Sequence, residues 1–374
     1  MKIAFFTDTF VPQTNGVVTS ILNSTDRLAR NGHKIMIFSP KIGKGLNLHK
    51  NIKVVELKSF NLLPKYKEME VRIPTFIKVL KNIRNFNPDV IHIHTPFGIG
   101  YEGFLCSKLL KKPLVGTYHT LLPDFLKHVS LAGLEKKEQT KNLTWKYSNL
   151  FYNRCDMVIT PSNIIKKELK KHGLNSRIEV VSNGVDLNKF YRKIIKNKKI
   201  TILHVGRISY EKNVDIVLQA MKIVSLYNKI KFIIVGGGPD LEKLKKYAEG
   251  INLDVEFTGV IKNENLAGYY NKANIFVTAS TIETEGIVIL EAMACGLPIV
   301  GVNKLAIPEI VKNGKNGFVA NENEPEDIAK YLIKLIKSKG LRNKLGRNSI
   351  KIARKYSLDN SVRKLENIYY SFLK

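Results

Sequence analysis

Cysteine is scarce in this chain: its 374 residues include only three, at Cys106, Cys155 and Cys295. None of them forms a CxxC pair and each lies among apolar residues, so the sequence favours reduced, buried thiols over a disulfide framework or a zinc site. The sequence also lacks any run of about 18 apolar residues, which a membrane-spanning helix needs. Asp8 interrupts the first apolar segment before a signal-peptide core is complete, so we expect a cytoplasmic protein.

Acidic residues are also few: the chain has 32 Asp and Glu against 61 Lys and Arg, a net charge of +29. Such an excess favours polyanionic partners, namely nucleic acid, phosphorylated substrates or an anionic membrane face. Residues 1 to 190 hold 30 basic and 14 acidic residues, and the remainder holds 31 and 18. Because the excess is spread over both halves, it fits a lysine-rich composition as well as a binding patch.

Short apolar segments alternate with helical patterns along the chain, which predicts parallel α/β sheets. The first series of expected strands is 3–7, 35–38, 54–57, 90–93, 114–117 and 157–160; the second is 201–205, 231–235, 255–258, 275–278 and 298–302. A charged, aperiodic linker at 187–199 separates them. We therefore predict two doubly wound, Rossmann-like parallel-sheet domains, 1–187 and 200–356, which face each other across a deep cleft. Ligands should bind beyond the carboxyl ends of the strands.

The first strand of the second domain is followed by two cations, Arg207 and Lys212, in the segment VGRISYEKN. Their position after a strand end favours phosphate binding over a solvated basic loop. The next strand ends in three glycines, 236–238, which offer bare backbone to a ligand but are also common in structural turns.

The segment ETEGIVILEAMACG, residues 283–296, has the densest group of candidate residues. Its helix should begin near Gly286, Ile287 and Val288, whose amides can hold a diphosphate. Glu283 precedes this helix and Glu291 lies in its second turn, so both carboxylates can accept hydrogen bonds from sugar hydroxyls. Glu291 interrupts an apolar run, where an unpaired carboxylate is costly to bury, and this favours a ligand-binding role.

The first domain contributes weaker candidates. Gly16 begins a helix after the loop PQTNG and fits either an anion site or a tight turn. His119 follows a strand and can donate to a substrate hydroxyl or phosphate, although a turn histidine is equally consistent. His92 and His94 should share one strand face, but no third residue is spaced to complete a metal site, so packing is the preferred interpretation.

Several catalytic motifs are missing from the sequence. It has no GxGxxG, P-loop, HExxH or DxD pattern and no Ser/His/Asp series, which disfavours nicotinamide-dependent dehydrogenases, P-loop kinases, triad hydrolases and metal-dependent sugar transferases of another fold.

Taken together, these residues resemble the retaining glycosyltransferases of family four, which have the GT-B architecture, and the resemblance spans nearly the whole chain. The segments GRISYEKN and ETEGIVILEAMACGLPIV carry most of it. The resemblance implies that Glu283 and His119 contact the donor sugar, that Glu291 binds the ribose, and that Arg207 and Lys212 bind the diphosphate. It also implies base recognition at Val260 and Ile261, a diphosphate contact at Gly16, and a C-terminal helix, 357–374, that crosses back to the first domain. The sequence departs from the family pattern at Asn15, where glycine is frequent, and at Glu285, where an aromatic residue is usual.

The resemblance further implies a metal-independent reaction with no cofactor beyond the nucleotide sugar, which is a co-substrate. UDP-glucose is the expected donor. The opening segment and HTPFGIGYEGF are most similar to transferases that glycosylate diacylglycerol, so we expect a lipid acceptor and attachment to the anionic inner face of the plasma membrane. In the segment IPTFIKVLKNIRNF, one apolar face of Ile77, Leu80, Ile83 and Phe86 flanked by Lys78, Lys81 and Arg84 fits such a surface. The periodicity alone favours an amphipathic helix that covers a sheet.

The sequence is compatible with three alternatives. A transferase of the same family can act on a polysaccharide or another glycoconjugate, with GDP-mannose as the donor. A sugar epimerase or phosphorylase can use the same architecture. A basic nucleic-acid-binding protein is disfavoured because no recognised binding module or aromatic stacking platform is evident, so no specific nucleic acid is expected.

Overall fold

The computed structural model describes residues 1–13, 15–43, 46–57, 59–61, 70–72, 76–121, 138–195, 199–227 and 230–373. The chain divides into two compact units: unit 1 comprises Met1–Asn183 and Leu358–Lys374, and unit 2 comprises Gly184–Ser357. Residues 187–195, where the sequence predicted a linker, belong to unit 2, and Phe190 is buried there. The sequence had no way to reveal this packing, because the segment has neither helical nor strand periodicity.

Unit 1 is built on a seven-stranded parallel sheet in the order β3-β2-β1-β6-β7-β8-β9. Its strands are β1 (Lys2–Phe6), β2 (Lys34–Ser39), β3 (Ile52–Glu56), β6 (Val90–Ile93), β7 (Leu114–Thr117), β8 (Met157–Thr160) and β9 (Ile178–Val180). β1 pairs with β2 on one side and with β6 on the other, so the strand order reverses beside β1. A separate antiparallel pair joins β4 (Ser59–Asn61) to β5 (Glu70–Arg72).

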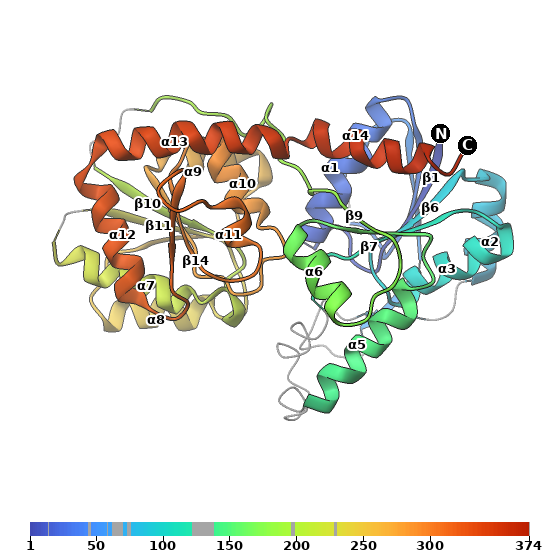
Figure 1. Ribbon diagram of the computed structural model, residues 1–374, viewed down its shortest axis with the longest axis horizontal. Helices are drawn as coiled ribbons and strands as arrows, with labels where there is room; N and C mark the ends of the chain where they lie inside the picture. Colours follow the sequence, from blue (N-terminus) through green and yellow to red (C-terminus); the bar gives the residue numbers. More distant parts are fainter. Residues whose placement is uncertain are drawn as a thin grey trace. The chain divides into compact units, whose positions relative to one another are not determined.

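Helices cover this sheet (Figure 1). They are α1 (Gly16–Arg30), α2 (Phe76–Phe86), α3 (Gly98–Leu110), α5 (Glu138–Tyr152), α6 (Asn163–Lys171) and α14 (Leu358–Tyr370). One side of α1 is buried because Ile21, Thr25 and Leu28 recur at helical spacing, and Ile21 and Leu28 belong to the apolar cluster of the sheet.

The C-terminal helix α14 is part of unit 1, although it follows unit 2 in the sequence (Figure 1). Leu358, Val362, Leu365 and Tyr369 of α14 are buried in the same apolar cluster as β1 and β2. Polar contacts with the region of α1 fix the register: the His33 ring lies 2.9 Å from Glu366, and Arg27 pairs with Asp359.

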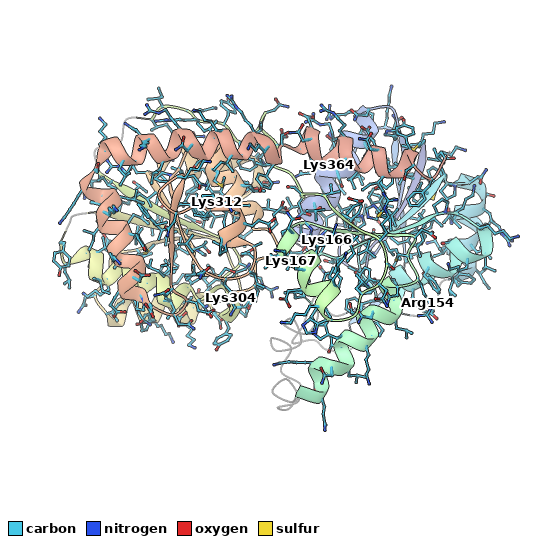
Figure 2. All side chains as sticks on the ribbon, viewed as in Figure 1. Arg154, Lys166, Lys167, Lys304, Lys312 and Lys364 are labelled. Atoms are coloured by element: carbon cyan, nitrogen blue, oxygen red, sulfur yellow. The ribbon has the colours of Figure 1, made fainter. Side chains whose placement is uncertain are left out.

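Basic side chains of unit 1 are distributed over several elements. Figure 2 labels Arg154 just after α5, Lys166 and Lys167 on α6, and Lys364 on α14. The charge excess of unit 1 is therefore not confined to one element. No helix among the described residues is long and apolar enough to cross a membrane.

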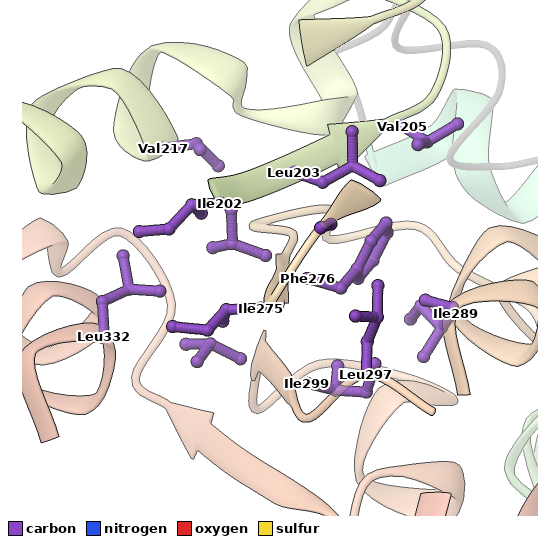
Figure 3. Packing of buried hydrophobic residues seen from close by; sticks show 14 of the residues in the cluster. Ile202, Leu203, Val205, Val217, Ile275, Phe276, Ile289, Leu297, Ile299 and Leu332 are labelled. Atoms are coloured by element: carbon purple, nitrogen blue, oxygen red, sulfur yellow. The ribbon is translucent and has the colours of Figure 1, made fainter. Parts of the chain in front are cut away.

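Unit 2 repeats the plan with a six-stranded parallel sheet in the order β12-β11-β10-β13-β14-β15. Its strands are β10 (Thr201–Val205), β11 (Lys231–Val235), β12 (Glu256–Gly259), β13 (Ile275–Val277), β14 (Ile299–Val302) and β15 (Gly317–Ala320). The helices are α7 (Val214–Ser225), α8 (Leu241–Gly250), α9 (Asn263–Lys272), α10 (Ile287–Ala294), α11 (Ile307–Ile310), α12 (Pro325–Lys337) and α13 (Lys339–Ala353). Figure 3 shows Phe276 of β13 packed among aliphatic side chains of the neighbouring strands and helices.

These two sheets confirm the predicted fold class of two Rossmann-like domains. The sequence missed β9 and β15, because each is a short segment beside turn-forming or charged residues. The residues predicted to share one apolar face of α2 differ in exposure: Ile83 is buried with Val79, as packing on the sheet requires, whereas Ile77 is 86% exposed. Residues 73–75 of that segment lie outside the described residues.

Candidate functional site

The strand order of unit 2 places its candidate residues at one edge of the sheet. β10 lies between β11 and β13, so the strand order reverses between β10 and β13. Such a reversal opens a crevice beyond the carboxyl ends of the strands, where open α/β sheets bind ligands. Arg207 and Lys212 follow β10, and Glu283 and Gly286 follow β13, so all four come from the two loops at the reversal.

Three contacts hold these two loops together. Lys212 Nζ lies 2.6 Å from Glu283 Oε1. The Asn213 side chain donates to the Ala279 carbonyl at 3.2 Å, and the Thr281 amide donates to the Glu211 carbonyl at 3.3 Å. The structure thus brings together the cation and the carboxylate that the sequence singled out separately.

The Lys212–Glu283 pair is mostly shielded from water, with side chains only 19% and 13% exposed. Burial by itself raises the pKa of Glu283. The charge of Lys212, its hydrogen bond to the carboxylate and the nearby His204 outweigh this effect, so the pKa is lowered. Glu283 is therefore a carboxylate at neutral pH, able to accept hydrogen bonds from hydroxyl groups.

His204 on β10 is a neighbour of this pair that the sequence analysis missed. Burial lowers the pKa of His204 to about 4, and the charge of Lys212 also lowers it, so the ring is neutral at pH 7. Its Nδ1 donates to the Val277 carbonyl at 3.0 Å, which ties β10 to β13. The only available signal in the sequence was a histidine inside an apolar strand, ILHV.

Glu291 lies on α10 and is buried, with 5% of the residue exposed. Tyr270 of α9 donates to Glu291 Oε2 at 2.8 Å. Burial raises the pKa of Glu291 to about 7, although the Tyr270 hydrogen bond and the charge of Lys189 oppose the rise. Tyr270 thus supplies a polar contact inside the protein, and the ligand-binding role of Glu291 stays a prediction.

Helix α10 begins after Gly286, whose φ of +90° is a left-handed conformation that glycine adopts without strain. Ile287 and Val288 form the first turn, so their amides point toward the loop that holds Glu283. The macrodipole of this helix favours negative charge at that end.

The three glycines after β11 are explained by close packing. A Cβ on Gly236 would lie 1.8 Å from the Gly206 carbonyl oxygen, and one on Gly238 would lie 2.1 Å from that of Ile208. The Ile208 amide also donates to the Gly237 carbonyl at 2.9 Å. These glycines therefore let the β10 and β11 loops approach each other, which favours the structural interpretation.

The other candidates of unit 2 lie on the surface of its loops. The Arg207 side chain is exposed just after β10. Val260 is 71% exposed and Ile261 is half-buried, directly after β12. Their side chains and backbone remain predicted ligand contacts, as the sequence assigned them.

In unit 1, the half-buried His119 follows β7 and contacts the buried His94, which follows β6. Its Nε2 lies 2.8 Å from His94 Nδ1. His92 contacts Tyr369 Oη at 2.6 Å and Thr117 Oγ1 at 2.7 Å, so both of its ring nitrogens are engaged in packing contacts, as expected. Burial lowers the pKa of His119 to about 3, which keeps its ring neutral.

Gly16 forms the first residue of α1, and Asn15 caps that helix by accepting from the Val18 amide at 3.0 Å. The asparagine that departs from the family pattern thus satisfies one of the amides that glycine would leave exposed.

Asp8 is a second residue whose role the sequence analysis missed. It follows β1 and accepts from the Ile99 amide at 2.7 Å and from Thr95 Oγ1 at 2.6 Å, so it caps α3 across the strand-order reversal of unit 1. Among the described residues, no group of three or more His, Cys, Asp or Glu side chains is arranged to hold a metal ion.

Both halves of the chain match known glycosyltransferase families. Residues 185–352 match the family described as "Glycosyl transferases group 1", and residues 14–189 match "Glycosyltransferase Family 4".

Curated relatives include two enzymes named alpha-monoglucosyldiacylglycerol synthase. The one from Streptococcus pneumoniae is 32% identical over 80% of this chain and 70% of its own length, and the one from Acholeplasma laidlawii is 28% identical over 100% and 98%. A GDP-mannose-dependent alpha-mannosyltransferase of Corynebacterium glutamicum is 28% identical over 85% and 76%.

Solved structures show the same fold at lower identity. Sucrose-phosphate synthase from Thermosynechococcus elongatus aligns with a TM-score of 0.81 at 17% identity, covering 100% of this chain and 99% of that one. Anabaena HepE in complex with UDP-glucose aligns with a TM-score of 0.77 at 19% identity, covering 99% and 100%. The fold is therefore GT-B, and the protein belongs to the family four glycosyltransferases.

Proposed function

We propose that this glycosyltransferase moves glucose from UDP-glucose to diacylglycerol or a related membrane lipid, with retention of the anomeric configuration and without a metal ion. The main support for binding of a nucleotide-sugar donor is the Lys212–Glu283 pair at the strand-order reversal of unit 2. The two side chains are 2.6 Å apart and largely buried. It joins a phosphate-binding cation to a hydroxyl-binding carboxylate in one site.

Donor binding divides among the residues of unit 2. Arg207, Lys212 and the first-turn amides of α10 hold the diphosphate, since all are hydrogen-bond donors with positive charge or a positive dipole. Glu283 accepts from the sugar hydroxyls and Glu291 accepts from the ribose. In unit 1, His119 donates to the sugar and Gly16 contacts the diphosphate.

The proposed reaction needs no protein nucleophile. The bond from the anomeric carbon to the diphosphate oxygen breaks, and the acceptor oxygen bonds to that carbon on the same face. The acceptor proton passes to the departing diphosphate oxygen. Lys212 and Arg207 stabilise the negative charge that develops there, which supplies the electrostatic help that a metal ion gives in other transferases.

An exposed apolar stripe in unit 1 supports a lipid acceptor. On α5, Leu143, Tyr147 and Leu150 recur at helical spacing and are 67%, 42% and 59% exposed. Lys146 lies exposed on the same helix. An apolar stripe with an adjacent cation is the arrangement that favours the interface of an anionic bilayer. The two relatives named alpha-monoglucosyldiacylglycerol synthase support the same acceptor.

The test is nucleotide release from a panel of UDP- and GDP-sugars, with and without vesicles that contain diacylglycerol and anionic lipid. We expect UDP release from UDP-glucose that depends on vesicles and yields a glycolipid. Release of GDP from GDP-mannose would contradict UDP-glucose as the donor. Release that needs a soluble glycan would contradict a lipid acceptor. No release from any donor would contradict a transferase activity.

A further inference from the structure

His94 is a buried residue that the proposed reaction does not use. It directly follows β6, and only 4% of it is exposed. Its ring stacks on Phe5 at a centroid distance of 5.1 Å and an interplanar angle of 15°, and it lies 4.2 Å from the ring of His92. The imidazole is thus held on two sides by rings of the sheet core and has little freedom to rotate.

The His94 ring makes a polar contact with His119, the residue proposed to bind the donor sugar. Its Nδ1 lies 2.8 Å from His119 Nε2, and the two rings are inclined by 21°, close to the coplanar arrangement that an in-plane hydrogen bond requires. On the opposite edge, His94 Nε2 is buried and meets no hydrogen-bond partner among the described residues.

This geometry determines where the proton lies. Burial, aided by the proximity of His92 and His119, lowers the pKa of His94, and burial lowers that of His119, so both rings are neutral and share one proton between Nδ1 and Nε2. A proton on His94 Nε2 would be a buried donor without an acceptor, which is unfavourable. The proton of His94 is therefore on Nδ1 and is donated to His119 Nε2.

We propose that His94 is a positioning residue, which holds the His119 ring in place and fixes it as the Nδ1–H tautomer. An imidazole that accepts at Nε2 carries its own proton on Nδ1, and it can present that N–H only to an acceptor atom, such as a hydroxyl or phosphate oxygen. His119 acts as a hydrogen-bond donor to the ligand and not as a base. The catalytic consequence rests on the proposed contact of His119 with the donor sugar; the tautomer itself does not.

The direct test is the ¹⁵N spectrum of histidine-labelled protein, in which two-bond couplings identify the protonated nitrogen of each ring. The His119 signal is assigned by its loss in His119→Gln. We expect His119 in the unaltered protein to be protonated at Nδ1. Protonation at Nε2 would overturn the inference without any variant and without any knowledge of the substrate.

Two substitutions of His94 separate positioning from packing. His94→Leu fills a similar volume without a donor, and His94→Asn places an amide N–H near the original Nδ1. We expect His94→Leu to shift His119 toward the Nε2–H tautomer and to lower kcat for transfer about 10- to 100-fold, with the Kd for UDP unchanged. In His94→Asn, we expect His119 to keep mostly the Nδ1–H tautomer and kcat to stay close to that of the unaltered protein.

The outcomes distinguish this inference from the proposed function. If the unaltered protein transfers sugar but the His119 tautomer and kcat are the same in His94→Leu, the positioning role of His94 is wrong. Equal loss of activity in the Leu and Asn variants, with equal shifts in melting temperature, would also overturn it in favour of packing alone. If no nucleotide sugar reacts but the tautomer responds as expected, the assigned hydrogen bond stands and the proposed function fails.

Discussion

At the scale of single residues, the Lys212–Glu283 pair distinguishes catalysis from nucleotide binding. Glu283→Gln preserves the size of the side chain and removes its charge. Because the carboxylate is proposed to bind the sugar and not the nucleotide, we expect kcat to fall about 100-fold or more, while the Kd for UDP measured by calorimetry changes less than about threefold.

The matched control for this variant is Glu322→Gln. Glu322 also pairs with a lysine, Lys304, at 3.0 Å, but both side chains are at least 40% exposed. An exposed pair contributes little, so this variant should behave as the unaltered protein. A loss of UDP affinity in Glu283→Gln as large as the loss of kcat would contradict the proposed division of roles.

Glu291 gives a second prediction, concerning pH. Its pKa is raised to about 7, from 4.5, so the folded protein keeps a proton in a range of pH where the unfolded chain has lost it. The folded state then binds more protons than the unfolded state, so this residue makes stability fall as pH rises through that range, and its penalty is complete above pH 7. Glu291→Gln removes the charge and keeps an acceptor for Tyr270.

We therefore expect Glu291→Gln to gain stability relative to the unaltered protein between pH 5 and pH 8, by up to about 3 kcal/mol, in urea unfolding. Glu242→Gln, at a side chain that is 76% exposed on α8, serves as the control and should show no such trend. A pH-independent difference for Glu291→Gln would mean that the carboxyl group is ionised throughout.

At the scale of elements, the close approach of the β10 and β11 loops can be tested at a glycine. Alanine at Gly236 would place its Cβ 1.8 Å from a backbone oxygen, at a φ of +146°. Backbone cannot move aside easily, so Gly236→Ala should destabilise unit 2 by about 2 kcal/mol or more in denaturant unfolding.

Gly250→Ala is the control, because nothing lies within 4 Å of the added atom at the end of α8. It should be neutral or stabilising by up to about 1 kcal/mol. Equal effects of the two substitutions would contradict the packing explanation of the glycines after β11.

The attachment of α14 to unit 1 depends on Tyr369, which is fully buried and hydrogen-bonded to His92. Tyr369→Phe would leave His92 Nδ1 without this partner, and we expect a loss of about 1–3 kcal/mol in thermal or chemical unfolding. The adjacent Tyr370 is 48% exposed, so Tyr370→Phe should change stability by less than about 0.5 kcal/mol. A similar effect at both tyrosines would mean that the buried hydroxyl contributes nothing specific.

Helices and strands were predicted well from the sequence where the hydrophobic periodicity is strong. They were predicted poorly where tertiary contacts determine the structure. Apolar runs such as Thr201–Val205 and Lys231–Val235 were recognised as strands with their observed bounds. The edge strand β9 escaped notice because three residues do not establish a period. The pairing of Lys212 with Glu283 spans 71 positions, and only the order of β10 and β13 in the sheet brings the two together.

The histidines of unit 1 also show that contacts between distant residues could not be predicted from the sequence. The sequence indicated that His92 and His94 share a strand face and that His119 follows another strand. It did not reveal that His94 contacts His119, because that contact depends on the pairing of β6 with β7.

At the scale of the whole molecule, the net charge of +29 is compatible with general attraction to anionic lipid and with a specific face on α5. Lys146→Glu and Lys351→Glu change the net charge equally, but only Lys146 lies beside the apolar stripe of α5; Lys351 is exposed on α13 of unit 2. We expect Lys146→Glu to reduce co-sedimentation with anionic vesicles about tenfold, since each cation near the surface contributes about 1 kcal/mol. Lys351→Glu should have little effect, and equal reductions would assign binding to net charge alone.

The proposed reaction is retaining transfer of glucose from UDP-glucose to a lipid hydroxyl by this family four glycosyltransferase. The most direct measurement is the proton NMR spectrum of the product formed from UDP-α-glucose and diacylglycerol vesicles. We expect a glucosyl lipid whose anomeric proton shows the small coupling of an α-linkage. A β-linked product would contradict retention, and the absence of any glucosyl lipid while another donor or acceptor reacts would contradict the proposed substrates.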